Sequence, residues 1–331
     1  MEKVGIALIG CGYWGKNYFK TLRDIEGIEL KWICDNQNLP KEHVFPYDRT
    51  TNNYARVLED ENVRGVIIAT PTKTHYKIAL EALQAGKDVL VEKPMASTPA
   101  ECISMIEHAK KYNRILTPGH IFVHNPAVQK LEEYIQDGML GDVIKMSASR
   151  FSLGPIRTEE NAMWDLMPHD ISMFLRFKKQ LPASVNAMGS SFLGRDVEDD
   201  VCLGLRYEDG LMATCEASWV DAEKVRKVRV IGKKKMAVFD DVDLNKLKVY
   251  DSGVVDVDKV DPFDYARTAR EGDIYIPKIS GKPPLEIQCE DFIRCIRTRE
   301  MPRVRPEEGY DVVRILHAAQ KSLEGRREIK L

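Results

Sequence analysis

The sequence predicts an α/β protein: an N-terminal domain built on a parallel sheet, followed by a C-terminal α+β domain with a large, open and mainly antiparallel sheet. Three observations support this prediction. A glycine-rich turn follows an apolar strand near the start, strands and helices alternate up to about residue 118, and short strands with tight turns dominate the second half. A chain of 331 residues also favours two domains, which we place at residues 1–120 and 121–331.

Composition and charge narrow the class of protein. Apolar residues make up 44% and charged residues 30% of the chain, and the formal net charge is −2 at pH 7. These values are typical of a soluble globular protein and give no electrostatic reason to expect nucleic acid as a partner. The apolar runs have the length of strands, so we expect no membrane span, and the first of them belongs to a strand rather than to a signal segment.

The cysteines and histidines do not predict a metal site. The 7 cysteines occur singly, without a C-x-x-C or zinc spacing, which is typical of reduced core thiols in a cytoplasmic protein. His120 and His124 suggest a metal pair, but no third ligand follows at a useful spacing, so we expect no metal.

The first strand, at residues 4–9, runs into a turn that contains Gly10, Gly12 and Gly15. This is the spacing G-x-G-x-x-G. The first glycine permits the tight turn, the second lets the backbone approach a pyrophosphate, and the third lets the following helix at 16–24 pack against the strand. The amide groups at the start of that helix would point at the phosphates.

An acidic residue follows the second strand. That strand, at 28–34, ends at Asp35, where a carboxylate can bind both hydroxyls of an adenosine ribose and repel a 2′-phosphate. A glycine turn alone would explain the motif without a ligand, but its context favours a Rossmann dinucleotide-binding domain, with NAD preferred to NADP. Tyr13 and Trp14, inside the turn, are further candidates for cofactor contact, although a tryptophan in the core is equally ordinary.

The alternation continues through the N-terminal domain. Thr98 and Glu101 form a capping box at the start of one helix. Thr70, Pro71 and His75 follow a strand end, so we expect them to line the nicotinamide side of the cofactor. The further helices and strands are predicted at 52–60, 65–69, 72–85, 88–92, 99–112 and 114–117.

Short strands characterise the C-terminal domain. Asn125 and Pro126 start a helix that ends near Gly138, and Asp209-Gly210 joins two strands as a hairpin. Residues 251–281 show no pattern that predicts an element. The strands are predicted around 144–148 and at 183–191, 201–207, 211–218, 225–231, 236–240 and 246–250, and the last helices at 285–299 and 306–323.

The step Glu92-Lys93-Pro94 follows the strand at 88–92, at the edge of the sheet where ligands of such folds bind. The proline holds Lys93 in extended geometry. A lysine at a strand end is ordinarily a solvated charge. Beside a nicotinamide it can instead hydrogen-bond a substrate hydroxyl and stabilise the alkoxide as hydride leaves.

A second candidate for chemistry is the segment from Trp164 to Asp170. Asp165 and His169 are spaced i, i+4 on a helix that we expect to start near Trp164 or Asp165, because Pro168 is tolerated only in a first turn. The histidine could accept a hydroxyl proton and the carboxylate could orient it. A surface Asp–His pair is the alternative.

The glycine turn, the E-K-P step and the D-x-x-x-H helix, in this order and spacing, resemble the Gfo/Idh/MocA family of nicotinamide-dependent sugar oxidoreductases. The resemblance covers essentially the whole chain. It implies that Lys93, Asp165 and His169 form the catalytic group and that Glu92 lies beside the cofactor. The glycine-rich run that many members carry before the aspartate is absent; Asn161-Ala162-Met163-Trp164 stands there instead.

The form W-D-L-x-P-H-D-I-S, with Gly119-His120 and Asn125-Pro126 upstream, looks more like the branch that acts on nucleotide-linked sugars. The diphosphate of such a substrate needs cations, for which Arg150 and Arg157 are the candidates. An ordinary surface arginine is the alternative for each of the two. The resemblance implies a substrate site that includes Lys93, His120, His124, Asn125, Arg150, Arg157, Asn161 and His169.

The expected activity is therefore the transfer of hydride between a secondary alcohol of a sugar and NAD. The expected reacting carbon is C3 of a UDP-N-acetylhexosamine. An inositol or free-sugar dehydrogenase of the same family is the first alternative, and a non-catalytic NAD-binding redox sensor is the second. We also expect a cis Lys93–Pro94 bond, and a homodimer or homotetramer through the C-terminal sheet. Met212, Val228 and Val230 would lie in that interface if they point outward.

Overall fold

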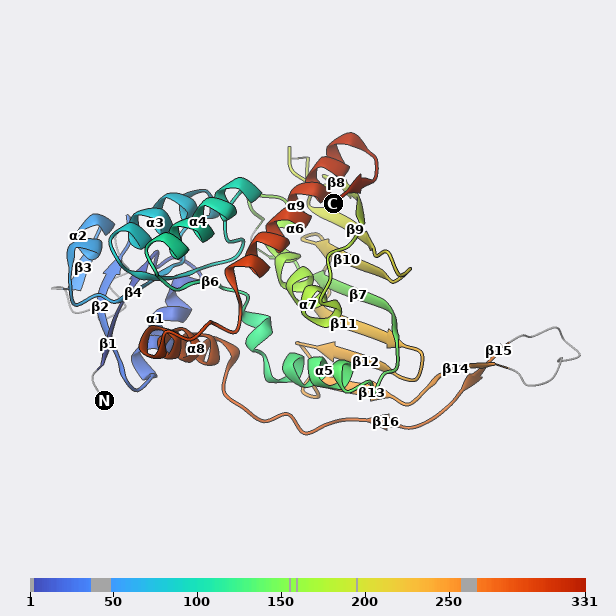
Figure 1. Ribbon diagram of the computed structural model, residues 1–331. Helices are drawn as coiled ribbons and strands as arrows, with labels where there is room; N and C mark the ends of the chain where they lie inside the picture. Colours follow the sequence, from blue (N-terminus) through green and yellow to red (C-terminus); the bar gives the residue numbers. More distant parts are fainter. Residues whose placement is uncertain (1–2, 37–48, 155, 159, 195, 257–266) are drawn as a thin grey trace, which may run out of the picture. The chain divides into compact units, whose positions relative to one another are not determined.

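The computed structural model describes residues 3–36, 49–154, 156–158, 160–194, 196–256 and 267–331 (Figure 1). The chain folds into two compact units. Unit 1 comprises Met1–His124 and Lys282–Arg314, and unit 2 comprises Asn125–Gly281 and Ile315–Leu331. The predicted α/β class is confirmed. The assignment of residues 1–120 to a dinucleotide-binding domain and of residues 121–331 to a substrate-binding and oligomerisation domain stays a prediction.

Unit 1 contains a six-stranded sheet in the order β3-β2-β1-β4-β5-β6, and every neighbouring pair is parallel. This is the strand order of a doubly wound dinucleotide-binding sheet, whose order reverses between β1 and β4. The short β3 was not predicted. The strands are β1 (Val4–Ile9), β2 (Ile28–Cys34), β3 (Thr50–Thr51), β4 (Gly65–Ile68), β5 (Asp88–Val91) and β6 (Leu116–Pro118).

Helices cover both faces of this sheet, with α3 and α4 on one side and α1 and α8 on the other (Figure 1). The capping box at Thr98 is confirmed, since its hydroxyl accepts from the amide of Glu101 and the Glu101 carboxylate accepts from the amide of Thr98. The helices are α1 (Gly15–Asp24), α2 (Tyr54–Glu59), α3 (Thr72–Gln84), α4 (Pro99–Lys111), the 3-10 helix η2 (Ile121–His124), α8 (Pro284–Thr298) and the first part of α9 (Pro306–Gly325).

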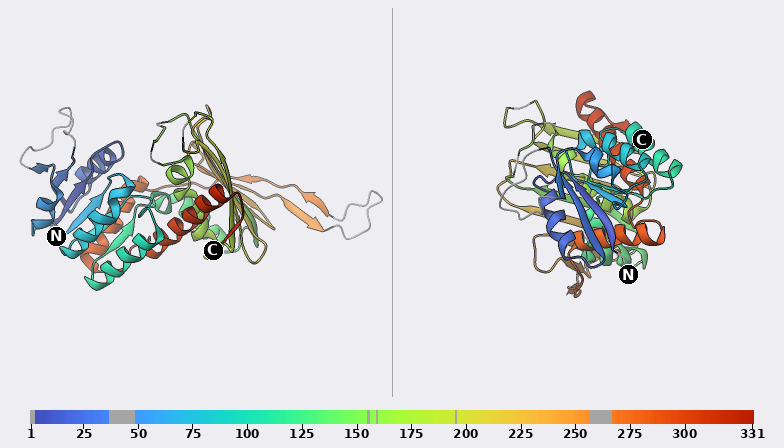
Figure 2. Two further views of the ribbon diagram at one scale, coloured as in Figure 1. Left: turned by 90° about the horizontal axis from the view of Figure 1, so that it is seen from above. Right: turned by 90° about the vertical axis from the view of Figure 1, so that its left-hand side faces the viewer.

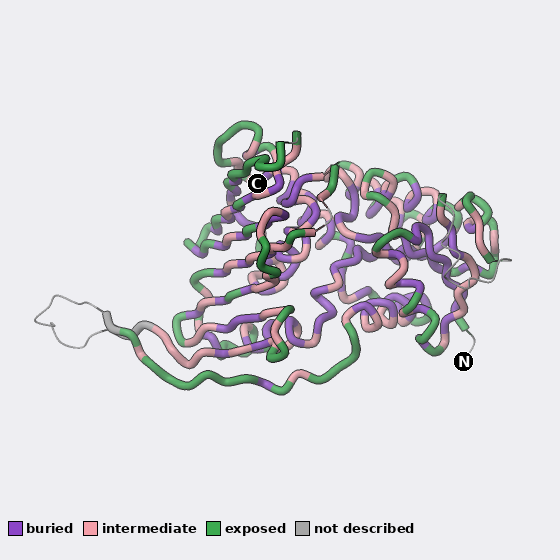
Figure 3. Tube along the Cα trace, turned by 180° about the vertical axis from the view of Figure 1, so that it is seen from behind, coloured by how far each residue is buried: buried purple, intermediate pink, exposed green. Residues whose placement is uncertain are grey.

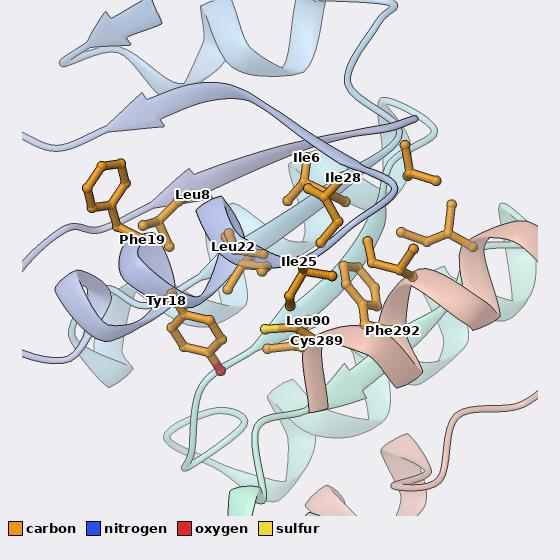
Figure 4. Close-up of a cluster of buried hydrophobic side chains, with 14 of the residues drawn as sticks. Ile6, Leu8, Tyr18, Phe19, Leu22, Ile25, Ile28, Leu90, Cys289 and Phe292 are labelled. Atoms are coloured by element: carbon orange, nitrogen blue, oxygen red, sulfur yellow. The ribbon is translucent and has the colours of Figure 1, made fainter. Parts of the chain in front are cut away.

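Helix α8 comes from the far end of the sequence but completes the core of unit 1. Its apolar stripe, Cys289, Phe292, Ile293 and Ile296, is buried in one cluster with side chains of α1 and the sheet. Figure 4 shows Cys289 and Phe292 of this stripe facing that cluster. The burial of each such side chain stabilises the folded state by about 1.5–3 kcal/mol. Helix α8 therefore belongs to the core of unit 1, although most of unit 2 precedes it in the sequence.

Unit 2 contains a nine-stranded sheet in the order β16-β13-β12-β11-β7-β10-β9-β8-β17. The pairs given by the ladder are antiparallel except for β7–β10, which is parallel, so the predicted mainly antiparallel sheet is confirmed. The strands are β7 (Val143–Phe151), β8 (Ser184–Ser190), β9 (Asp200–Arg206), β10 (Met212–Ser218), β11 (Val225–Gly232), β12 (Met236–Asp240), β13 (Leu247–Tyr250), β16 (Ile274–Tyr275) and β17 (Ile329–Lys330).

Helices α5 (Pro126–Gln136), α6 (Ala162–Leu166) and α7 (Pro168–Lys178), with the second part of α9, cover one face of this sheet (Figure 2). Val228 and Val230 are 1% and 0% exposed and therefore point to the inside. Their expected place in an outer interface was wrong, because alternation along β11 puts Lys227 and Arg229 outside instead. Met212 does point outward, and is 44% exposed.

The segment for which the sequence predicted no element contains β14 (Gly253–Asp256) and β15 (Arg267–Arg270), which pair as an antiparallel ribbon. Residues 257–266 of that segment lie outside the described part of the chain. Residues 271–276 are exposed along the trace in Figure 3. Among the described residues, we find no helix that is both long and apolar enough to cross a membrane.

Candidate active site

The glycine turn after β1 has the geometry that a dinucleotide requires. Gly10 has a φ of +93°, and a Cβ on it would lie 2.6 Å from the carbonyl oxygen of Ala69. A Cβ on Gly15 would overlap the carbonyl oxygen of Gly10, so the start of α1 can lie this close only with glycine. Gly12 differs, because no atom lies within 4 Å of the place of its missing Cβ. That open side gives a pyrophosphate room to approach the backbone.

The start of α1 also suits an anion. This helix has no side-chain cap and no acidic residue in its first turn, so its first amide groups are not covered by a carboxylate of their own helix. Tyr13, in the turn, is 82% exposed. The residues present thus fit the dinucleotide that the sequence predicts.

Asp35 lies beside the same turn. Its Oδ2 accepts a hydrogen bond of 2.6 Å from the backbone amide of Cys11. Burial and the Asp35 charge raise the pKa of the Cys11 thiol to about 11, so this cysteine is no nucleophile. The contact fixes the carboxylate at the end of β2, next to the turn that would hold the pyrophosphate, where Asp35 could bind the hydroxyls of the adenosine ribose.

Glu92, at the end of β5, is 7% exposed. Its Oε1 accepts from the indole Nε1 of Trp14 at 2.8 Å and from the Tyr18 hydroxyl at 2.6 Å, and its Oε2 accepts from the backbone amide of Lys93 at 3.1 Å. Burial raises the pKa of Glu92, while these donors and the Lys93 charge favour the ionised form. Trp14 therefore uses its indole N–H within unit 1.

The Lys93–Pro94 bond is cis, as predicted. On its far side, the carbonyl oxygen of Pro94 lies 2.9 Å from Nδ1 of His75, and the Nε2 of the same ring lies 2.8 Å from the carbonyl oxygen of Thr70. His75 is 1% exposed. It links the backbone after β4 to the backbone after β5, and Pro71 begins the turn between Thr70 and α3.

His120 and His124 lie in η2 or directly before it and are 0% and 2% exposed. Burial, with a smaller contribution from Lys93, lowers the pKa of His120 to about 3, so its ring is neutral. Neither ring nitrogen of His120 has a hydrogen-bond partner among the described residues. Among all the residues that the structure describes, no group of three or more His, Cys, Asp or Glu side chains could hold a metal ion.

In unit 2, Asp165 and His169 lie on successive helices, α6 and α7, rather than on one helix. The break falls at Pro168, which has no backbone N–H to donate and occupies the first turn of α7. The backbone of Met167 stays helical and accepts from the amide of Ile171, so the i, i+4 placement is preserved. Asp165 is 9% exposed, and its Oδ1 pairs with Nε of Arg157 at 2.8 Å.

Two predicted substrate ligands cap helices. Asn161 accepts from the amide of Trp164 at the start of α6, and its Nδ2 donates to Glu198 at 2.8 Å and to Gln320 at 3.0 Å. Asn125 accepts from the amide of Ala127 at the start of α5. These contacts account for the burial of both asparagines.

Arg150 forms a buried ion pair. Its Nε and Nη2 donate to the two carboxylate oxygens of Asp170 at 3.0 and 2.8 Å, and the side chains are 6% and 1% exposed. A substrate phosphate would have to compete with this bidentate pair. Arg157, with a side chain 52% exposed, is the more accessible cation.

Sequence reasoning missed three residues that hold this machinery in place. Tyr18 lies four residues after Trp14, on the same face of the chain, so its spacing was a usable signal. Gln288 interrupts the apolar stripe of α8 and donates to the Tyr18 hydroxyl at 2.6 Å, and a polar residue in such a stripe is also a usable signal. Asp170 gave no local signal.

Two family models match the chain. Residues 4–120 match the oxidoreductase family with an NAD-binding Rossmann fold, and residues 128–238 match the GFO/IDH/MocA C-terminal domain. Together with the sheet order and the glycine turn, these matches define the class of protein: an oxidoreductase with NAD as its cofactor. The chain belongs to the Gfo/Idh/MocA family.

Relatives within the family act on different sugars. Myo-inositol 2-dehydrogenase of Thermotoga maritima is 24% identical over an alignment of 340 positions, which covers 98% of each chain. UDP-N-acetylglucosamine 3-dehydrogenase of Acidithiobacillus ferrooxidans is 30% identical over 192 residues, which cover 58% of this chain and 59% of that enzyme. The solved structure of the latter has a TM-score of 0.80 at 23% identity and covers 98% of this chain and 99% of its own; it shows the shared fold.

Proposed function

We propose that this protein is an NAD-dependent dehydrogenase that oxidises a secondary alcohol of a nucleotide sugar, with C3 of a UDP-N-acetylhexosamine as the reacting carbon. The observation that carries the proposal is the Lys93 step. Its backbone is held by Glu92 on one side and by His75, through Pro94, on the other, in the unit that contains the glycine turn. A lysine that served only as a solvated charge would not need this support.

Oxidation of the alcohol removes a hydride from carbon and a proton from oxygen, and leaves a ketone. NAD supplies the hydride acceptor. His169 would accept the hydroxyl proton, because imidazole transfers protons readily near neutral pH. Lys93 would hydrogen-bond the same oxygen and stabilise the negative charge that develops there. Asp165 would orient the imidazole of His169.

Two observations support a nucleotide sugar. The relative that is 30% identical acts on UDP-N-acetylglucosamine, and the half-exposed guanidinium of Arg157 suits a diphosphate. Substrate roles for His120, His124, Asn125, Arg150 and Asn161 stay predictions. Since the myo-inositol enzyme aligns over 98% of both chains, an inositol or free sugar is the second candidate.

The non-catalytic redox sensor is the remaining alternative. A sensor needs no proton relay, so the presence of Lys93, Asp165 and His169 argues against it. The test is to incubate purified protein with NAD and separate panels of UDP-sugars, inositols and free sugars, and to follow the absorbance of reduced cofactor. We expect turnover with a UDP-N-acetylhexosamine; turnover only with inositols or free sugars would reject the nucleotide-sugar assignment, and none in any panel would favour the sensor.

We also propose a cytoplasmic homodimer or homotetramer that forms through the open face of the unit 2 sheet. Met188 and Met212 are exposed on that face, among charged side chains such as Glu216 and Arg229. Apolar side chains in such a place favour an interface. Light scattering at micromolar concentration measures the mass, and the mass of a single chain would contradict the oligomer.

A further inference from the structure

One buried carboxylate joins the glycine turn to the Lys93 step. Glu92 receives hydrogen bonds from Trp14, which lies in the turn, from Tyr18, which lies on α1, and from the backbone of Lys93 itself. The first two donors are 78 and 74 residues away in sequence. The contacts therefore tie the segment that would bind the pyrophosphate to the residue that would act on the substrate.

A second layer fixes the direction of these hydrogen bonds. Gln288, which is 2% exposed, donates from Nε2 to the Tyr18 hydroxyl at 2.6 Å, so that hydroxyl is left to donate to Glu92. On another side, a Cβ on Gly119 would lie 2.9 Å from Oε1 of Glu92. Only glycine leaves the carboxylate this space. Donors and close packing thus hold the Glu92 side chain in one orientation.

A purely structural role explains this arrangement poorly. A buried carboxylate loses several kcal/mol of solvation, and replacing buried charges by apolar groups of similar shape is often neutral or stabilising. Burial raises the pKa of Glu92, yet both of its oxygens accept hydrogen bonds, which an apolar side chain at this position could not do. Among the groups that these hydrogen bonds hold, Lys93 is the one held by its backbone.

We propose that Glu92 is a positioning residue for Lys93, and that Trp14 and Tyr18 set Lys93 in register with the glycine turn. This inference rests on the proposed function only for the catalytic role of Lys93. Placing a reacting group within a fraction of an ångström matters greatly, since a misplacement of about 1 Å can lower the rate about 10²-fold. Loss of the Trp14 contact should therefore impair the Lys93 step without removing any group that touches the substrate.

The test compares Glu92→Gln and Trp14→Phe with a matched control, Trp32→Phe. Trp32 also donates its indole N–H to a carboxylate, that of Asp60 at 2.7 Å, and it lies in the same unit without a link to Lys93. Each variant is assayed for kcat and KM. In the protein without cofactor, acylation of Lys93 by acetic anhydride is measured by peptide mass spectrometry, relative to Lys233, whose side chain is 64% exposed.

For Glu92→Gln we expect kcat to fall about 10- to 100-fold, with KM changed by less than about threefold. Acylation of Lys93 should accelerate by at least about threefold, because the backbone of Lys93 is no longer held by the carboxylate. Trp14→Phe should show the same changes to a smaller degree, and Trp32→Phe neither. If Glu92→Gln fails to fold by circular dichroism, Trp14→Phe and Tyr18→Phe carry the test.

Unchanged acylation of Lys93 in the folded variants would overturn the proposal, even with reduced kcat, because Glu92 would then act by another route. Accelerated acylation together with normal turnover of Lys93→Met would have a different meaning. Glu92 would still hold Lys93, and the catalytic role of Lys93 in the proposed function would fail instead.

Discussion

The candidate site residues of unit 1 and those of unit 2 are held in place by different means. In unit 1, the glycine turn, Asp35, Thr70 and Lys93 all follow parallel strands, and the carboxyl ends of parallel strands meet at one edge of a sheet. In unit 2, individual side-chain pairs hold several of the candidate residues, such as Arg150 with Asp170 and Asp165 with Arg157. The order of strands in a parallel sheet therefore predicts the site residues of unit 1. Those of unit 2 depend on tertiary contacts that residue spacing in the sequence does not predict.

The largest test of this contrast is His169→Ala. If His169 is the proton acceptor in unit 2, kcat should fall roughly 10²- to 10⁴-fold, because general base catalysis contributes about that much. The affinity for NAD should not change, since the glycine turn lies in unit 1. Steady-state kinetics and cofactor titration measure both. His317→Ala, a half-buried histidine on α9, is the control, and equal turnover of the two variants would remove His169 from the mechanism.

The fold shows how far local patterns reach. The predicted helices and strands of both halves lie within a few residues of those observed, because apolar periodicity, capping and turn residues are local signals. Two features do not follow from local signals. Helix α8 was predicted, but its membership in unit 1 follows from its packing on α1. Strand β17 pairs with β8, although the two strands are far apart in the sequence.

The site shows the same limit. The motif spacing indicated Glu92 and Lys93 but not the donor Gln288, which lies 270 residues from Tyr18. In unit 2, the spacing placed Asp165 and His169 close together but assigned them to one helix. Pairing partners determined the rest, because an arginine such as Arg150 looks the same in sequence whether it binds a phosphate or a buried aspartate.

Arg150→Met tests the buried pair directly. Removing one partner of a buried ion pair leaves the charge of Asp170 uncompensated, so we expect the free energy of unfolding to fall by about 3–5 kcal/mol. The exposed pair of Arg206 and Glu328, 3.9 Å apart with an Arg206 side chain 75% exposed, is the control; Arg206→Met should change it by about 0–1 kcal/mol. Urea denaturation measures both. A raised KM for the substrate with unchanged stability would return Arg150 to the substrate site.

Asp35→Ala tests the topological group. The carboxylate should disfavour a 2′-phosphate, so its removal should narrow the ratio of NAD to NADP affinity by roughly tenfold, which is about 1.4 kcal/mol. NAD affinity itself should fall too, because the amide of Cys11 loses its acceptor. Fluorescence titration with both cofactors measures the ratio. Asp24→Ala, an exposed acid at the end of α1, should leave it unchanged; equal ratios in the parent and in Asp35→Ala would exclude Asp35 from cofactor selection.

The smallest effect concerns Asp311, in the part of α9 that belongs to unit 1. Burial, reinforced by Glu308 and Glu307, raises the pKa of Asp311 to about 6, against an ordinary value of 3.8. The folded protein thus holds this proton more tightly than the unfolded chain. Its contribution to stability is fully present below about pH 4 and is lost as the pH rises through about 6.

Asp311→Asn should therefore stabilise the protein at pH 7.5 by about 1 kcal/mol, a value discounted for the partial exposure of the side chain. At about pH 4 the gain should vanish, because Asp311 is already protonated in the folded parent. Urea denaturation of parent and variant at both values measures the difference. An equal gain in stability at both pH values would mean that the asparagine acts through packing rather than through the buried charge. A loss of stability at pH 7.5 would show that an attraction, such as that of Arg314, outweighs the cost of burying the ionised carboxylate.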